Sequence, residues 1–274
     1  MEPKERAPGT DYRILLDHAE AWAETAGEML RTAQDDRRTI DFKGKINLVT
    51  EMDRRVERYL GSQVRETFPD HDLLAEEEER NVDTGADFRW IIDPLDGTTN
   101  YAHGLPIYSV SIACEHHGRI VAGAVYQPVL GEMFTATLGG GARLNGETIT
   151  VTSEDQLERA LLVTGFPYDM HDSDRDNLDH FRAFMKTARA VRRLGSAALD
   201  LCYVACGRFD GFWEMKLFPW DLAAGSIIAS EAGGQLTSLD GGELSVFDGS
   251  VIASNGCIHG AMLHVLQNAG TRPT

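Results

Sequence analysis

Trp90-Ile91-Ile92-Asp93-Pro94-Leu95-Asp96-Gly97-Thr98-Thr99-Asn100 is the most informative segment of the sequence. An apolar run typical of a buried strand ends here in two aspartates, and Pro94 predicts that the chain leaves the strand and turns where they stand. Two carboxylates at the mouth of a strand repel each other unless a cation separates them. Ligands that are all oxygen suit a hard ion such as Mg²⁺ better than zinc.

The residues after Asp96 predict an anion site beside these carboxylates. If a helix begins near Gly97, its first backbone N–H groups have no partner within the helix and can bind phosphate. Metal ligands and anion donors would then be adjacent in the chain, as phosphoryl transfer requires. A bare Asp-x-x-Asp is often only a turn with a helix cap. The apolar run before it and Gly-Thr-Thr after it make this string far more specific.

Two further segments contribute carboxylates. Glu76-Glu77-Glu78-Glu79 follows Asp72-Leu73-Leu74-Ala75, and Asp221 lies in Pro219-Trp220-Asp221-Leu222-Ala223-Ala224-Gly225. Taken alone, the first segment is typical of a solvated face and the second of a helix N-cap. Together with Asp93 and Asp96, they supply several carboxylates from separate elements.

Composition limits the classes of function. The 274 residues are 42% hydrophobic and 25% charged, which is ordinary for a globular protein with a sizeable core. The formal net charge of -17 disfavours nucleic-acid binding, and bound divalent cations would let an anionic substrate approach. The polar first ten residues predict no secretory signal, and no apolar run reaches the ~18 residues of a membrane helix. We therefore expect a cytoplasmic protein with no membrane partner.

The hydrophobic pattern mixes helices and strands. Apolar spacings of three and four predict helices from residue 10 or 11 to about 33 and over 51–67, with a strand or hairpin at 41–50 between them. Alternation and glycine-rich turns predict an antiparallel meander over residues 108–138. After residue 150, predicted strands (160–164, 190–193, 211–215, 251–254) alternate with predicted helices (177–188, 197–206, 221–232, 258–267), and a hairpin is expected at 234–246.

This order indicates a layered α/β or α+β architecture. We expect a tail at residues 1–10, an N-terminal α+β part with the metal motif at 11–150, and a C-terminal α/β part at 151–270. The weakest seam lies near Val151 to Leu157. The two parts are expected to form one continuous catalytic unit.

On these motifs the sequence resembles the inositol monophosphatase family, part of the lithium-sensitive, magnesium-dependent phosphatases. The resemblance runs from about Leu15 to Leu266. It rests on Trp90 to Asn100, continuing through Tyr101-Ala102-His103-Gly104-Leu105-Pro106, and on Trp220 to Gly225, followed by Glu231-Ala232-Gly233-Gly234. The resemblance implies a layered αβαβα sandwich, like that of the inositol monophosphatases and fructose-1,6-bisphosphatases. It also implies two or three Mg²⁺ ions in each site and a homodimer.

The resemblance assigns metal ligands by position. Glu76, Asp93 and the backbone carbonyl of Leu95 would hold the first ion. Asp93, Asp96 and Asp221 would hold the second, and Glu76 would help with a third through waters.

The same resemblance assigns the phosphate and water contacts. Gly97 and Thr98 would offer N–H groups to the phosphate. Asp53, in a stretch similar to the family's early motif, would polarise the attacking water together with Thr98, with Glu77 nearby. Read alone, Asp53 is a typical surface residue of a helix.

Residues on the substrate side are also implied by position. Ser196 stands where threonine is common in the family's sugar-contacting loop, and Glu214 matches a position that accepts hydrogen bonds from ring hydroxyls. Gly165-Phe166-Pro167-Tyr168 resembles the rim of bacterial members. The residues expected to contact the substrate are Asp96, Gly195, Ser196, Ala197, Glu214 and Asp221.

We expect a Mg²⁺-dependent phosphomonoesterase acting on a small polyol phosphate, with inositol-1-phosphate the best candidate. A metal ion would activate water, so the hypothesis needs no covalent phospho-enzyme. The scaffold also hosts histidinol-phosphate, fructose-1,6-bisphosphate and 3′-phosphoadenosine-5′-phosphate phosphatases, which the metal motifs do not separate. Some bacterial relatives also act as binding proteins in transcription complexes. The acidic surface disfavours RNA contact but leaves a protein partner open.

Overall fold

The computed structural model describes residues 11–36, 45–76 and 84–269. Its α-helices are α1 (Tyr12–Asp36), α2 (Lys45–Thr67), α3 (Thr98–His103), α4 (Leu178–Thr187), α5 (Ala197–Ala205), α6 (Pro219–Glu231) and α7 (His259–Asn268). The first sheet contains β1 (Asp72–Ala75), β2 (Phe88–Asp96), β3 (Ser109–His116), β4 (Arg119–Gln127), β5 (Glu132–Thr137), β6 (Gly141–Leu144) and β7 (Glu147–Thr148). The second contains β8 (Leu161–Thr164), β9 (Ala190–Arg192), β10 (Gly211–Met215), β11 (Gln235–Thr237) and β12 (Ser250–Ser254).

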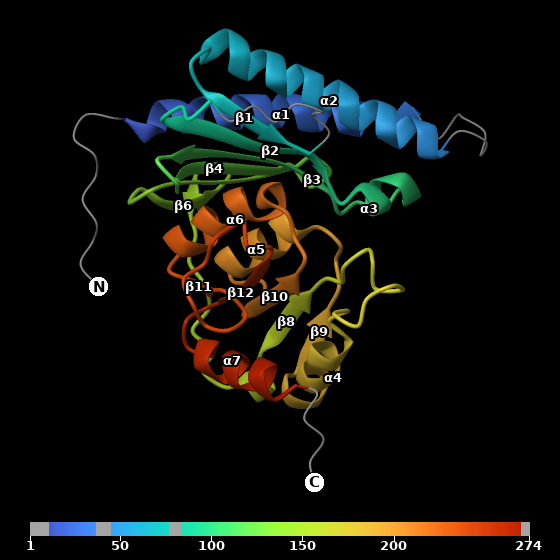
Figure 1. The fold of residues 1–274 in the computed structure, drawn as a ribbon, viewed down its shortest axis with the longest axis vertical. Coiled ribbons are helices and arrows are strands. Elements are labelled where there is room, and N and C mark those ends of the chain that lie inside the picture. Colours follow the sequence, from blue (N-terminus) through green and yellow to red (C-terminus); the bar gives the residue numbers. More distant parts are fainter. Residues whose placement is uncertain (1–10, 37–44, 77–83, 270–274) are drawn as a thin grey trace.

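These elements stack in five layers, which Figure 1 shows from top to bottom. Helices α1 and α2 cover one face of the first sheet, and α5 and α6 lie between the two sheets. Helices α4 and α7 cover the far face of the second sheet. The expected αβαβα sandwich is therefore confirmed.

Each boundary between helices and a sheet has its own apolar core. On β2, Trp90 and Ile92 belong to the core under α1 and α2, whereas Ile91 belongs to the core around α5 and α6. On β10, Phe212 belongs to that same middle core and Trp213 to the core under α4 and α7. Because neighbouring strand residues point to opposite faces, one strand serves two layers.

The first sheet has its strands in sequence order, and every pairing after β1–β2 is antiparallel. The predicted meander is therefore confirmed. The second sheet has the order β11-β12-β10-β8-β9, with β10 and β9 parallel to β8 and with β12 antiparallel to β10.

Pro94 does not end the strand as the sequence predicts. Strand β2 runs on to Asp96, with a register shift against β3 between Asp93 and Asp96. Proline has no N–H to donate, so pairing lapses at Pro94 and resumes where Asp96 faces Ser109. This irregularity lies between the two aspartates of the motif.

Two other expectations about local structure are wrong. Residues 45–50 begin α2 and form no strand or hairpin, while 41–44 lie outside the described residues. The hairpin expected at 234–246 is reduced to β11, which pairs with β12. Neither error moves an element that carries the motifs.

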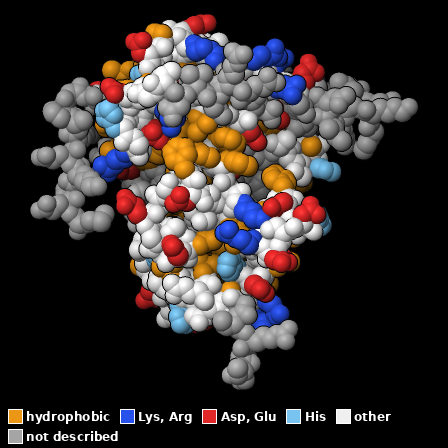
Figure 2. Space-filling view, in the orientation of Figure 1, with side chains coloured by type: hydrophobic (Ala, Val, Ile, Leu, Met, Phe, Trp, Pro, Cys, Tyr) orange, Lys and Arg blue, Asp and Glu red, His pale blue; other side chains and the backbone are white. Residues whose placement is uncertain are grey.

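Figure 2 shows acidic side chains scattered over one face of the molecule, with a few Lys and Arg side chains among them. Across the part of the chain that the structure describes, none of the helices combines the length and apolar character needed to cross a bilayer.

Candidate metal and phosphate site

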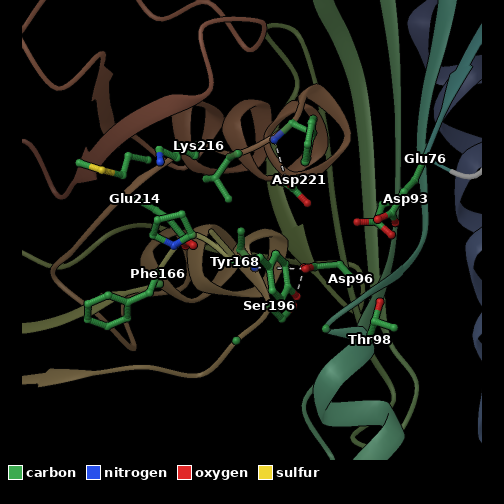
Figure 3. A pocket seen from close by; sticks show the side chains of 18 of the residues that line it. Glu76, Asp93, Asp96, Thr98, Phe166, Tyr168, Ser196, Glu214, Lys216 and Asp221 are labelled. Carbon is green, nitrogen blue, oxygen red and sulfur yellow. Dashed lines mark hydrogen bonds between the residues drawn. The ribbon is translucent and has the colours of Figure 1, made fainter. Parts of the chain in front are cut away.

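Three aspartates that are distant in the sequence meet at one point. Asp93 and Asp96 lie at the end of β2, and Asp221 lies in the first turn of α6. One carboxylate oxygen from each lies within 4.8 Å of the other two. Figure 3 shows the three side chains at one end of a pocket, with Glu76 beside Asp93.

Backbone donors hold two of these carboxylates. The Leu95 N–H donates to Asp93 Oδ1 at 2.9 Å, and the Phe218 N–H donates to Asp221 Oδ2 at 2.7 Å. Each contact uses one of the two oxygens of its carboxylate. The second oxygen of each aspartate therefore has lone pairs left for a cation.

Asp96 also fixes the start of α5. Its Oδ2 accepts hydrogen bonds from the Ser196 hydroxyl at 2.5 Å and the Ala198 N–H at 2.9 Å, and its Oδ1 accepts from the Ala197 N–H at 3.3 Å. Negative charge at a helix N-terminus is stabilised by the free N–H groups and the helix dipole. One carboxylate thereby joins the metal motif to the loop expected to contact the substrate.

The negative charge of the aspartate cluster is not balanced by nearby basic side chains among the described residues. Asp93 is 2% exposed, and its pKa is raised well above the usual range by burial and then by the charges of Glu76, Asp96 and Asp221. Burial is also the main cause of the raised pKa values of Asp96 and Asp221. Among the described residues, no Lys or Arg lies within ion-pair distance of these three aspartates. A set of oxygen donors with this charge fits a hard divalent cation.

Gly97 and Thr98, the residues predicted to bind phosphate, lie next to the aspartate cluster. Gly97 has a φ of +96°, and a Cβ there would lie 3.0 Å from the Ile107 carbonyl oxygen. Only glycine fits this turn without strain. The Thr98 hydroxyl donates to the Leu95 carbonyl oxygen at 3.0 Å, so its proton is committed and its Oγ1 can still accept a hydrogen bond.

The aspartates open into a cavity of about 180 Å³. Predicted site residues that line it are Glu76, Asp93, Leu95, Asp96, Gly97, Thr98, Gly195, Ser196, Ala197, Glu214 and Asp221. The bacterial-type segment from Gly165 to Tyr168 lines it as well. Figure 3 shows Glu214 across the pocket from Asp93 and Glu76, so the cavity has two distinct ends.

Two of the predicted catalytic residues are not among the described residues that line the cavity. Asp53 is buried on α2 and is not among the described residues that line the cavity. Glu77 lies outside the described residues. The roles assigned to both residues remain predictions.

Glu214 is a buried acid at the end away from the metal cluster. Its side chain is 8% exposed, and burial, followed by the charges of Asp221 and Asp96, raises its pKa to about 8. Arg193 acts in the opposite direction. A buried carboxyl group at this end of the cavity can donate hydrogen bonds to a polar ligand or accept them from it.

Sequence reasoning missed several lining residues. Arg193, Lys216 and Phe218 face the cavity, and Lys216 Nζ donates to Asp169 and to Ser173 Oγ at 2.7 Å. Their nearness in the sequence to Gly195, Glu214 and Asp221 was the available signal. Nearness in the sequence alone does not predict which neighbours of a site residue point into the cavity.

Comparisons with known proteins identify the family. A model of the inositol monophosphatase family matches residues 11–271. The phosphatase IMPL1, chloroplastic, of Arabidopsis thaliana is 45% identical over 91% of this chain and 69% of its own length. The Nus factor SuhB of Pseudomonas aeruginosa is 40% identical over 92% of this chain and 96% of its own length.

A solved structure shows the same fold. The inositol monophosphatase from Anabaena (Nostoc) superposes with a TM-score of 0.88 at 38% identity, covering 95% of this chain and 98% of that chain. Motifs, layers and matched length all point the same way. The chain therefore belongs to the inositol monophosphatase family and is a phosphoric monoester hydrolase of that family's type.

Proposed function

We propose that this phosphatase uses Mg²⁺ and hydrolyses a small polyol phosphate, with inositol-1-phosphate as the best candidate. The observation that carries the proposal is the convergence of Asp93, Asp96 and Asp221 beside Gly97 and Thr98. The products would be the free polyol and phosphate.

The donor set fits the proposed metal. Glu76, Asp93, Asp96, Asp221 and the Leu95 carbonyl would hold two or three Mg²⁺ ions. When bound, Mg²⁺ supplies charge that neutralises the phosphate and the leaving oxygen and lowers the pKa of water. Oxygen ligands and high negative charge support this choice over a softer metal.

The chain's own groups would bind and orient the phosphate. The N–H groups of Gly97 and Thr98 would donate to its oxygens. Thr98 Oγ1, whose proton is committed to the Leu95 carbonyl, would accept a hydrogen bond from the attacking water. We keep Asp53 and Glu77 as proposed partners of that water, on the strength of the family resemblance.

The opposite end of the cavity would hold the polyol. Polar contacts to its hydroxyl groups would come from Glu214, from the carboxylates of Asp96 and Asp221, and from Gly195, Ser196 and Ala197 where the chain enters α5. At about 180 Å³ the cavity is smaller than the roughly 300–1,000 Å³ of sites for drug-sized ligands. A compact substrate is therefore favoured.

Phosphate release from a substrate panel tests the proposal. The panel contains inositol-1-phosphate, histidinol phosphate, fructose-1,6-bisphosphate and 3′-phosphoadenosine-5′-phosphate, each with Mg²⁺ and with EDTA. We expect Mg²⁺-dependent turnover with the highest kcat/KM on inositol-1-phosphate. A higher kcat/KM on another member of the panel would reassign the substrate. Full activity in EDTA would refute the proposed requirement for Mg²⁺.

The variant Asp93→Asn tests the metal ligands directly. Loss of a ligand carboxylate should weaken Mg²⁺ binding and lower kcat/KM by at least ~100-fold, while the fold is retained. The exposed Asp70→Asn, in the turn before β1, is the matched control and should keep normal activity. Near-normal turnover by Asp93→Asn would refute the assignment.

A second candidate function is a binding role in a transcription complex. The relative named Nus factor SuhB, which matches nearly the whole chain, supports it. Pull-down of RNA polymerase components by both the parent protein and Asp93→Asn would favour this role. Absence of capture, with normal phosphatase activity, would leave catalysis as the function.

The homodimer that the resemblance implies is proposed as well. Light scattering after size-exclusion chromatography should give twice the mass of one chain, and a single-chain mass would contradict the proposal. The cytoplasmic location stays a prediction for imaging of a tagged protein.

A further inference from the structure

We infer that Gly165 and Asn177 are positioning residues that hold the carboxyl group of Glu214 at the substrate end of the cavity. The inference rests on the proposed function, in which Glu214 accepts hydrogen bonds from substrate hydroxyls. It adds two residues outside the metal and phosphate machinery whose effect on the reaction would pass through Glu214.

Gly165 lies directly against the Glu214 carboxyl group. A Cβ at Gly165 would lie 2.0 Å from Oε1 and 2.3 Å from both Cδ and Oε2 of Glu214. Such distances are far shorter than any van der Waals contact, so a side chain at position 165 would displace the carboxyl group. Gly165 is not among the glycines with positive φ. Space, and not backbone conformation, therefore requires glycine here.

The sheet explains why these two residues meet. Strands β8 and β10 are parallel neighbours, with Thr164 paired to Trp213. The Thr164 hydroxyl donates to the Trp213 carbonyl oxygen at 2.6 Å. Gly165 directly follows the last residue of β8, and Glu214 is the next residue on β10. The missing side chain of Gly165 leaves room for the carboxyl group of Glu214.

Asn177, directly before α4, connects the end of β8 to the Trp213 side chain of β10. It is 3% exposed, and its Nδ2 donates to the Gly165 carbonyl oxygen at 2.6 Å and to Thr164 Oγ1 at 2.9 Å. Its Oδ1 accepts from Trp213 Nε1 at 2.8 Å. This buried amide therefore links the Gly165 backbone and the Thr164 hydroxyl to the indole of Trp213, the residue before Glu214.

The consequence for the reaction is selective. Misplacing a substrate-positioning group by about 1 Å can cost on the order of 100-fold in rate. Displacing Glu214 should weaken contacts with polyol hydroxyls and leave the metal and phosphate groups where they are. A substrate without those hydroxyls should therefore be less sensitive.

Steady-state kinetics of Gly165→Ala test the inference. We expect KM for inositol-1-phosphate to rise at least ~10-fold, with kcat/KM for 4-nitrophenyl phosphate changed by less than ~2-fold. Gly260→Ala is the matched control, because a Cβ there meets nothing within 4 Å and its φ is not positive. Unchanged KM in Gly165→Ala, or an equal loss on both substrates, would overturn the inference.

A double-mutant cycle separates the Glu214 contact from other effects. In a Glu214→Ala background, Gly165→Ala should add no further change in KM, because the group that it displaces is gone. The same additional loss in both backgrounds would overturn the inference. If Gly165→Ala fails to fold, folding of the double variant supports the contact, and failure of the double variant overturns it.

Asn177→Asp tests the second residue. The aspartate keeps an acceptor for Trp213 but loses the two donors to Gly165 and Thr164. We expect a rise in KM confined to the polyol phosphate, as for Gly165→Ala. An equal loss on both substrates would show that Asn177 has only a structural role.

A crystal structure of Gly165→Ala keeps the inference separate from the proposed function. If the parent protein does not hydrolyse inositol-1-phosphate, the proposed substrate is wrong. The structure then still decides the positioning: a displaced Glu214 carboxyl supports it, and an unmoved one overturns it.

Discussion

Replacing Asp200 by asparagine tests how the protein tolerates a buried acid beside its acidic cavity. Asp200 lies in the first turn of α5, is 1% exposed, and neither of its carboxylate oxygens has a hydrogen-bond partner among the described residues. Burial raises its pKa well above the usual range, the charges of Glu214 and Asp96 add to this, and Arg193 opposes it. The folded protein therefore holds this carboxyl group protonated under conditions in which the unfolded chain ionises it.

The sign of the effect on stability follows from linkage. Because the folded pKa is raised, the stabilisation is complete below the unfolded pKa of about 3.9 and is lost as pH rises toward the folded pKa. Between the two values the folded state binds one more proton, so the free energy of unfolding falls by about 1.4 kcal/mol per pH unit. Asparagine has no such proton. The stability of Asp200→Asn relative to the parent should therefore rise with pH above about pH 4, by up to about 1.4 kcal/mol per unit, until the pH reaches the folded pKa.

Urea unfolding at three pH values in EDTA measures this slope without bound metal. The asparagine amide of the variant adds a constant offset to the comparison with the parent, since unpaired donors cost about 1–3 kcal/mol at every pH. Leu199→Met is the control, a buried neighbour without an ionisable group, whose difference of less than about 1.5 kcal/mol should not depend on pH. A stability difference for Asp200→Asn that stays flat with pH would refute the reasoning, because it would mean that folding does not change the protonation of Asp200.

Three further variants probe the site. Ser196→Ala removes the hydroxyl that donates to Asp96 Oδ2 at 2.5 Å, and calorimetry should show Mg²⁺ binding weakened by about 10–100-fold; unchanged affinity would show that this contact does not orient Asp96. Gly97→Ala places a Cβ at a φ of +96° and should lower the free energy of unfolding by about 1–3 kcal/mol in urea titrations; parent-like stability would contradict the strain. Glu214→Gln should raise KM for polyol phosphates or shift substrate preference with kcat largely retained, and an identical profile across the whole panel would remove the sugar-contact role.

Much of the fold could be predicted because helices and strands leave a local periodic pattern of apolar residues in the sequence. The spacing of Leu15, Leu16, Ala19 and Trp22 predicted α1, and alternation predicted the strands of the meander. The start of α2 was missed, although Ile46, Val49 and Met52 continue the spacing of three and four residues that Val56 and Leu60 show. The turn at Pro94 was wrong because a single missing donor interrupts a ladder without ending the strand.

The family, the layered fold and the residue types of the metal cluster could be predicted from the sequence alone, because short motifs and local periodicity carry them. Which of these carboxylates meet depends on the tertiary fold, because Asp93 and Asp96 come from a strand end and Asp221 from a distant helix start. The same holds for the contact of Gly165 with Glu214 and the bonds of Asn177, since the pairing of β8 with β10 creates them. Packing between segments distant in the chain has no local sequence signal, so it appears only once the sheets and helices are assembled.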